Sequence, residues 1–177
     1  MHNAFSQACE VEAQSLEVLR PFIQQKALNG QYVLTNKGAL ARELQKSVGD
    51  VLFNGTSDEI YGIEIKAESE NRTGNFFLEF WSNRKRFTPG WMFYLDTDLL
   101  FYYFLESDDL YIINFRKLKR WFWWHENGQM PNFTRFKTRP QSKYDQLNDT
   151  WGTCIPIDVI GSEVGFKLFN PLSLEAA

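Results

Sequence analysis

Two acidic side chains and one lysine stand at a spacing that could bring them together on neighbouring strands. Asp50 precedes an apolar stretch at residues 51–53, and Glu64 and Lys66 lie two residues apart in a second stretch, residues 60–66. Successive strand side chains alternate between the two faces, so Glu64 and Lys66 share one face. Two carboxylates beside an ammonium group could hold Mg²⁺ and support hydrolysis of a phosphodiester.

The residues between the two stretches predict a β-hairpin. Residues 54–59 (Asn-Gly-Thr-Ser-Asp-Glu) are rich in turn-forming types. A symmetric hairpin places Asp50 opposite Glu64, and the same register pairs Val51 with Ile63. A slip of one residue would move Asp50 in among the isoleucines, so the apolar pattern favours this pairing.

The segments before the hairpin predict two helices and a short extended piece. Apolar residues recur at helical spacing over residues 3–26, with a bend or interruption at Pro21. Residues 31–35 are expected to be extended. A second helix is expected over residues 37–47 and ends at Gly49.

The segments after the hairpin predict further strands and one more helix. Residues 76–82 alternate as a strand that turns Glu79 to its polar face, whereas residues 97–105 fit either a helix or a strand. We also expect an extended segment at 91–95, a strand at 111–115, a helix over 116–124, a long loop over 127–149 and a short edge strand at 155–157. This order predicts an α/β fold with a central mixed β-sheet flanked by helices.

Length and composition favour one folded domain. The chain has 177 residues, of which 44% are hydrophobic and 16% aromatic, too apolar for a disordered protein. We expect one domain over residues 1–177, with a helical part to about residue 47, a core from about 37 to 120 and an extension from about 121. The two cysteines match no zinc or redox spacing, which favours a reduced, cytoplasmic compartment. We expect no membrane partner, because neither a signal peptide nor a membrane-length apolar run is found.

Charge is unevenly distributed along the chain, although the formal net charge is only −3. Residues 43–70 hold seven acidic and two basic residues, whereas residues 114–143 hold eight basic residues and one acidic residue. An acidic centre beside a basic segment suits a metal site next to a polyanion such as DNA. A solvated basic face that offsets an acidic one would give the same distribution.

The order of a helix, a strand with Asp and a strand with Glu-x-Lys resembles the core of the PD-(D/E)xK nuclease superfamily, which has the restriction endonuclease-like fold. The resemblance covers roughly residues 37–81, and its first motif here is Gly49-Asp50 rather than Pro-Asp. It implies that Asp50 and Glu64 bind one or two Mg²⁺ or Mn²⁺ ions. It also implies that the backbone carbonyl of Ile65 completes the inner shell of ligands.

The same resemblance implies that Lys66 orients or helps to deprotonate the attacking water and stabilises the pentavalent phosphate. A lysine beside two carboxylates should stay protonated, which favours electrostatic stabilisation over the role of general base. Glu43 and Glu79 are additional candidate ligands. Each of these two would otherwise be an ordinary surface or ion-pairing residue.

Two basic segments and one aromatic run could contact DNA. The candidate phosphate contacts are Arg84, Lys85 and Arg86 in the first segment and Arg135, Lys137 and Arg139 in the second. The first segment would otherwise be a cationic turn exposed for solubility. The aromatic run at residues 121–124 (Trp-Phe-Trp-Trp) could stack on unpaired bases, but a packed core or a dimer patch is favoured.

Together these features predict a Mg²⁺-dependent nuclease that hydrolyses DNA, with endonucleolytic cleavage favoured and Asp50, Glu64 and Lys66 as the catalytic residues. One alternative is a nuclease-like fold that only binds nucleic acid or a protein. Another is an ordinary α/β domain with an exposed Glu–Lys pair, which would bind no divalent metal. Many members of the superfamily work as dimers, so a homodimer is also an open alternative.

Overall fold

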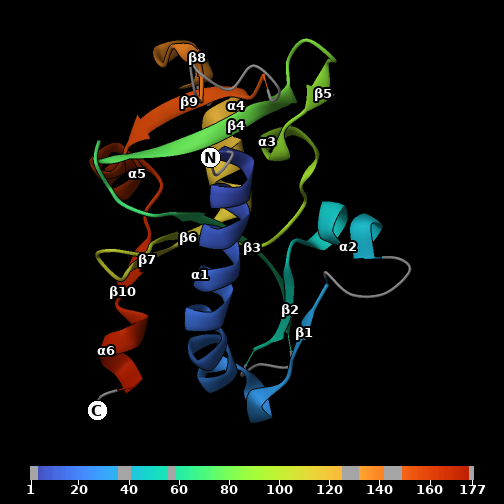
Figure 1. Cartoon of the computed structure of the whole chain (residues 1–177), viewed down its shortest axis with the longest axis vertical. Helices are drawn as coiled ribbons and strands as arrows, with labels where there is room; N and C mark the ends of the chain where they lie inside the picture. Colours follow the sequence, from blue (N-terminus) through green and yellow to red (C-terminus); the bar gives the residue numbers. More distant parts are fainter. Residues whose placement is uncertain (1–3, 36–40, 56–58, 125–131, 142–148, 176–177) are drawn as a thin grey trace.

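The structure, a computed structural model, describes residues 4–35, 41–55, 59–124, 132–141 and 149–175 (Figure 1). It has a mixed sheet of six strands in the order β1-β2-β3-β6-β7-β10 and an antiparallel sheet of four strands in the order β5-β4-β9-β8. The α/β class with a mixed sheet is therefore confirmed, and the second sheet is an addition that the sequence did not predict.

The strands of the two sheets come from interleaved parts of the chain. Those of the first sheet are β1 (Tyr32–Leu34), β2 (Val51–Asn54), β3 (Ile60–Glu68), β6 (Leu99–Phe104), β7 (Asp109–Asn114) and β10 (Lys167–Phe169). Those of the second sheet are β4 (Asn75–Asn83), β5 (Thr88–Pro89), β8 (Thr138–Pro140) and β9 (Trp151–Pro156). In the first sheet only the central pair β3–β6 is parallel. The chain segment that connects these two strands contains β4 and β5 of the second sheet.

The helices cover the sheets. They are α1 (Ala4–Lys26), α2 (Ala41–Val48), α3 (Trp91–Tyr94), α4 (Phe115–Trp123), α5 (Ile157–Glu163) and α6 (Pro171–Glu175), with short 3₁₀ turns at Leu28–Gly30 and Asn132–Arg135. Helix α1 runs along the long axis of the molecule in front of the six-stranded sheet (Figure 1). Pro21 lies inside α1 and does not interrupt it. None of the described helices has the length and apolarity needed to cross a bilayer.

Strand β6 is the centre of the core, because it is covered on both faces. Its residues Leu100, Tyr102 and Phe104 pack toward the second sheet and α4, whereas Phe101 and Tyr103 pack toward α1. A strand covered on both faces is a continuous apolar run without alternation. This explains why residues 97–105 could not be assigned to a helix or a strand from the sequence.

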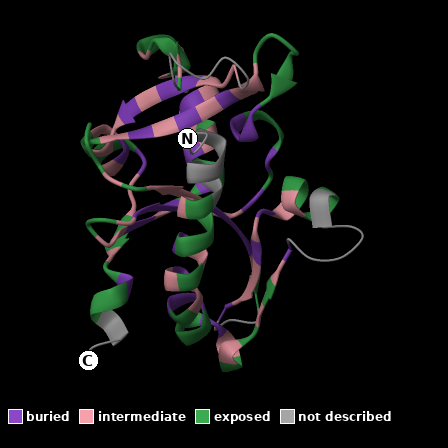
Figure 2. Cartoon of the chain, in the orientation of Figure 1, coloured by how far each residue is buried: buried purple, intermediate pink, exposed green. Residues whose placement is uncertain are grey.

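One tyrosine joins the two sheets. The hydroxyl group of Tyr102 in β6 accepts a hydrogen bond of 3.0 Å from the backbone N–H of Phe77 in β4 and donates one to the carboxylate of Glu68 in β3. Burial and the neighbouring carboxylate raise the pKa of Tyr102 well above its usual value, so the hydroxyl keeps its proton for this bond. Figure 2 shows the buried positions of β4 alternating with more exposed ones, as the sequence predicts.

Three expectations about the second half of the chain are wrong. Residues 91–94 form the helix α3 rather than an extended segment, because Trp91 and Met92 are buried in the core and fix the turn. The expected loop at 127–149 contains, in its described part, the 3₁₀ turn and strand β8.

The third wrong expectation is the edge strand at 155–157. Residues 155–156 lie at the end of β9, which is an interior strand. It lies between β4 and β8. Pro156 is tolerated because it is the last residue of β9 and pairs only with Asn75 of β4, while β8 ends its pairing at Thr153.

Candidate active site

The hairpin of β2 and β3 has the register that the sequence predicts. Val51 pairs with Ile63 in antiparallel arrangement. Asp50 immediately precedes β2, and its N–H donates to the carbonyl of Ile63 at 2.7 Å. Asp50 and Glu64 therefore lie on adjacent chain segments at the same level of the sheet.

The backbone before Asp50 is held in one position by a glycine and a threonine. Gly49 has a φ of 89°, and a Cβ atom there would lie 2.5 Å from the carbonyl oxygen of Ile63. The Thr35 hydroxyl donates to the carbonyl of Gly49 at 2.6 Å, and the Thr35 N–H donates to the carbonyl of Asp50 at 3.0 Å. Only glycine combines this φ with such close backbone contact.

Both carboxylate oxygens of Asp50 have partners. Oδ2 accepts a hydrogen bond of 2.9 Å from the N–H of Ile65, and Oδ1 accepts one of 3.2 Å from the Gln45 side chain of α2. The carbonyl of a strand residue points to the same side as its N–H, so the Ile65 carbonyl is also on the side of Asp50. The helix before the hairpin thus contributes Gln45 to the site.

Glu64 and Lys66 form a close ion pair on the face of β3 opposite α1. Lys66 Nζ lies 2.5 Å from Glu64 Oε1, and only 6% of Glu64 is exposed. Burial raises the pKa of Glu64 to about 7, with Lys66 lowering it and Asp50 raising it further. Burial disfavours the charged form of Lys66, but the attraction of Glu64 and Asp50 outweighs it and raises the lysine pKa. Lys66 is therefore a fixed cation.

Strand β4 of the second sheet contributes a third carboxylate, and helix α3 contributes an aromatic ring. Burial raises the pKa of Glu79 in β4, whereas the charge of Lys66 and a hydrogen bond from the Trp91 N–H lower it. Lys66 Nζ also lies 5.8 Å from the centre of the Trp91 ring. Glu79 is thus part of the charge cluster around Lys66, on a different sheet from Glu64.

The sequence reasoning missed Glu12 of α1. Partial burial raises the pKa of its carboxyl group, and the charges of Lys66 and Asp50 act on it with opposite signs. Glu12 is thus a fourth carboxylate of the cluster. Its helix contains other acidic residues at Glu10 and Glu17, and no local pattern distinguishes the one that tertiary packing brings to the site.

Of these residues, Gln45, Asp50 and Glu64 border a cavity of ≈ 500 Å³. Its lining is Gln45, Lys46, Asp50, Glu64, Ser82, Thr88, Pro89 and Tyr94. Ser82 lies near the end of β4, and Thr88 and Pro89 form β5. The basic hairpin of residues 84–87 therefore extends directly from the wall of this cavity, which we call the polar cavity.

The other predicted site residues are more dispersed. Glu43 is exposed on α2, 3.7 Å from Lys46, and does not line the polar cavity. The Arg84 guanidinium lies 4.1 Å from the centre of the Trp151 ring, whereas Lys85 and Arg86 extend into solvent.

The second basic segment also has one side chain that is held by a contact and two that are exposed. Arg135 is held by Glu163 through two hydrogen bonds of 2.8 and 3.0 Å, whereas Lys137 and Arg139 are exposed.

The aromatic run at 121–124 is mainly structural. Phe122 is fully buried, and Trp121 and Trp123 are partly buried against the same core. Trp124 is 71% exposed, so the packed-core alternative is confirmed for three of the four residues and does not hold for Trp124. The helix ends at Trp123, so Trp124 lies just beyond it.

The donor set at the polar cavity suits Mg²⁺ better than a metal that needs a full set of side-chain ligands. Within the described ranges, no three or more Asp, Glu, His or Cys side chains gather so as to hold an ion by themselves. Mg²⁺ is commonly bound by one or two carboxylates, several waters and substrate phosphate. Asp50, Glu64 and the Ile65 carbonyl would be enough protein ligands for an ion bound in this way.

Comparisons of the chain with protein-family models, with curated proteins and with solved structures find no match. The geometry and chemistry of the polar cavity are therefore what indicate a function.

Proposed function

We propose that the protein is a metal-dependent deoxyribonuclease of the PD-(D/E)xK type, with a restriction endonuclease-like core, that cleaves DNA internally. The observation that carries the proposal is that Asp50 and Glu64 line one cavity in the predicted hairpin register, with Lys66 ion-paired to Glu64. Buried charges are costly unless they are paired, and they cluster where a protein does chemistry. A Glu–Lys pair that served only solubility would be exposed.

The proposal assigns a separate role to each group. Asp50 and Glu64, with the carbonyl of Ile65, would hold Mg²⁺ or Mn²⁺. When bound, such an ion acidifies a water and neutralises charge on the phosphoryl oxygens. Lys66 keeps its proton, so it supplies a positive charge and hydrogen-bond donors to the phosphate rather than acting as a base.

The carboxylates around Lys66 support this electrostatic role. Glu64, Asp50 and Glu12 all favour the charged form of the lysine. Glu79 adds a further negative charge and is itself positioned by the N–H of Trp91. Glu79 can serve as an additional ligand, as the sequence suggests, because it interacts with Lys66, whereas Glu43 is exposed beside Lys46 and is the weaker candidate.

The basic hairpin beside the polar cavity gives the DNA a place to bind. Lys85 and Arg86 are exposed at its tip, where they can contact phosphates on either side of the scissile bond. Phe87 at the same tip is 78% exposed with a φ of 52°. At the other edge of the second sheet, Lys137 and Arg139 are exposed, which extends the basic surface across the sheet.

A catalytically inactive protein that binds nucleic acid or a protein partner is the second candidate. The observation that favours it is that both carboxylates are already occupied, Asp50 by two hydrogen bonds and Glu64 by Lys66. In this alternative, the charge cluster stabilises the fold and the basic hairpin alone makes the contact.

Plasmid cleavage distinguishes the two candidates. Purified protein is incubated with supercoiled and linear duplex DNA in Mg²⁺, in Mn²⁺ and in EDTA, together with the variants Lys66→Ala, Glu64→Ala and the exposed control Glu43→Ala. We expect metal-dependent nicking by the wild type and by Glu43→Ala only. DNA binding without cleavage in any metal would instead support the inactive binder.

A further inference from the structure

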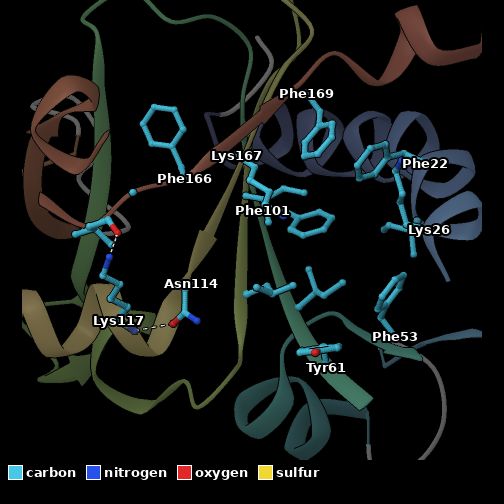
Figure 3. A pocket seen from close by; sticks show the side chains of 16 residues that line it. Phe22, Lys26, Phe53, Tyr61, Phe101, Asn114, Lys117, Phe166, Lys167 and Phe169 are labelled. Carbon is cyan, nitrogen blue, oxygen red and sulfur yellow. Dashed lines mark hydrogen bonds between the residues drawn. The ribbon is translucent and has the colours of Figure 1, made fainter. Parts of the chain in front are cut away.

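A second cavity, of ≈ 600 Å³, lies on the α1 face of the six-stranded sheet (Figure 3). It is bordered by the last turns of α1, by strands β2, β3, β6 and β7, and by the segment that leads from α5 into β10. Six aromatic rings line it: Phe22, Phe53, Tyr61, Phe101, Phe166 and Phe169. We call it the apolar cavity, and its volume falls within the range of about 300–1,000 Å³ that is typical of small-molecule sites.

The apolar cavity exists because neither neighbouring segment covers this part of the sheet. Phe22 and Ile23 of α1 border one side and Phe166 borders the other (Figure 3). Between them, Leu99 and Ile112 of the sheet are only partly buried. Apolar side chains that face a void lack dispersion contacts, so an apolar ligand would gain both contacts and burial there.

The charged residues of the lining are all of one sign. They are Lys26, Lys117 and Lys167, and the lining includes no Asp or Glu. The chain as a whole has a net charge of −3, so this local excess of positive charge is opposite to the overall charge. A cavity lined by one sign of charge attracts ligands of the other sign.

Each lysine is positioned without a carboxylate. Lys26 Nζ lies 5.7 Å from the centre of the Phe22 ring and 5.9 Å from that of Phe169. Lys117 donates to the carbonyl of Val164, and Lys167 is exposed on β10. Among the described residues, none of the three lysines forms an ion pair with Asp or Glu. Their charges are therefore available to an anion.

We propose that the apolar cavity binds an amphipathic organic anion, such as a fatty acid or an aromatic acid. The hydrocarbon body lies between the aromatic rings, and the acidic group lies against the ammonium groups at the rim. This inference concerns a different face of β3 from the polar cavity and does not depend on the nuclease proposal.

Competition between an acid and its matching alcohol tests the proposal. Anilinonaphthalene sulfonate, which fluoresces in apolar sites, is bound to the full chain and displaced by laurate or by lauryl alcohol below their aggregation limits. We expect laurate to bind at least about tenfold more tightly than the alcohol, because only the acid gains charge-assisted bonds to lysine. Equal affinities for the two compounds would overturn the proposal.

Two sets of variants locate the site. The double variant Lys26→Gln, Lys167→Gln should weaken laurate binding about tenfold and leave the binding of the alcohol unchanged. Lys117 is left in place because it also holds the Val164 carbonyl. The control Lys85→Gln removes an exposed lysine that does not line the cavity and should change neither affinity. Ile112→Trp fills the cavity and should abolish both.

These variants also show which results would contradict the proposal. A double lysine variant that still prefers laurate by the same factor, or an Ile112→Trp protein that folds and binds both compounds, would overturn the proposal. Sedimentation velocity completes the test, because a dimer that Ile112→Trp dissociates would show that a second copy of the chain covers this face instead. If Ile112→Trp does not fold, as judged by its thermal unfolding, the exposed lysine variants still decide the question.

Discussion

The two cavities use neighbouring residues of the same strand for opposite kinds of chemistry. Ile63 lines the apolar cavity and Glu64 lines the polar cavity, although they are adjacent in sequence. The difference follows from the alternation of a strand, which turns Ile63 toward α1 and Glu64 toward the second sheet. At the polar cavity, Glu64 and Lys66 are paired with one another, whereas at the apolar cavity three exposed lysines without carboxylate partners border a mainly apolar space.

Because the two cavities lie on opposite faces of β3, we expect that each can be altered without changing the other. A variant of the polar cavity should change cleavage of DNA without changing the binding of laurate. A variant of the apolar cavity should change the binding of laurate without changing cleavage of DNA.

The largest effect is expected for Lys66→Ala. Removing the cation that is paired with Glu64 should lower the rate of plasmid nicking by at least about a hundredfold, as losing a transition-state hydrogen-bond donor does elsewhere. Single-turnover cleavage by the wild type and the variant measures the difference. Unchanged laurate binding controls for the fold, and cleavage at near wild-type rate would remove Lys66 from the mechanism.

A large and pH-dependent effect is expected for Glu64→Gln in the absence of metal. The pKa of Glu64 is raised from 4.5 to about 7 in the folded state, so its contribution to stability is complete below pH 4.5 and is lost as the pH rises through about 7. Relative to the Gln variant, the wild type should lose up to about 3 kcal/mol of unfolding free energy over this window.

Urea unfolding in EDTA, at about pH 5 and about pH 8, measures this difference. Glu43→Gln is the matched control, since Glu43 is exposed on α2. A wild type that becomes more stable than Glu64→Gln as the pH rises would reverse the sign and contradict the burial argument.

A smaller loss of stability is expected for Gly49→Ala. The new Cβ atom would adopt a disfavoured φ and would meet the Ile63 carbonyl, at a cost of about 1–3 kcal/mol. Because Gly49 sets the position of Asp50, cleavage should fall further than stability alone explains. Gly74→Ala is a control with a similar φ of 64° and open space around it. Equal effects of the two substitutions on cleavage would show that Gly49 does not position the site.

The smallest effect is expected at the basic hairpin. Lys85→Ala and Arg86→Ala should each lower the slope of DNA affinity against salt concentration by about one and weaken binding uniformly across sequences. Fluorescence anisotropy at several salt concentrations measures the slope. Arg135→Ala provides the comparison, because its guanidinium is held by Glu163 and should contribute less. A larger effect at Arg135 would move the DNA to the other edge of the second sheet.

The sequence predicts the local parts of the polar cavity because they depend on short-range patterns. Strand alternation and turn composition were enough for the hairpin, its register and the shared face of Glu64 and Lys66. Residues 76–82 and 111–115 were recognisable as strands for the same reason. The helix expected at 116–124 is confirmed as α4, and Asn114 caps it by accepting from the N–H of Lys117.

The remaining parts depend on long-range packing, which leaves no local pattern. The charge of Glu12 acts on Lys66 although α1 is far from β3 in sequence. Gln45 reaches Asp50 because α2 precedes the hairpin closely. The separation of β4 from β3 into a second sheet could not be inferred from two similar amphipathic strands. The apolar cavity was missed entirely, since its wall comes from α1, the sheet and residues 164–169, which are far apart in sequence.

Binding of Mn²⁺ at the polar cavity tests the central claim most directly. Electron paramagnetic resonance counts the bound Mn²⁺ in the Lys66→Ala protein with a short DNA duplex, so that the phosphate ligands are present and cleavage is prevented. We predict a bound ion that is lost when Asp50→Ala is added and kept when the control Glu43→Ala is added. Absence of bound Mn²⁺, or binding that Asp50→Ala does not weaken, would contradict the assignment of this cavity as a metal-dependent hydrolytic site.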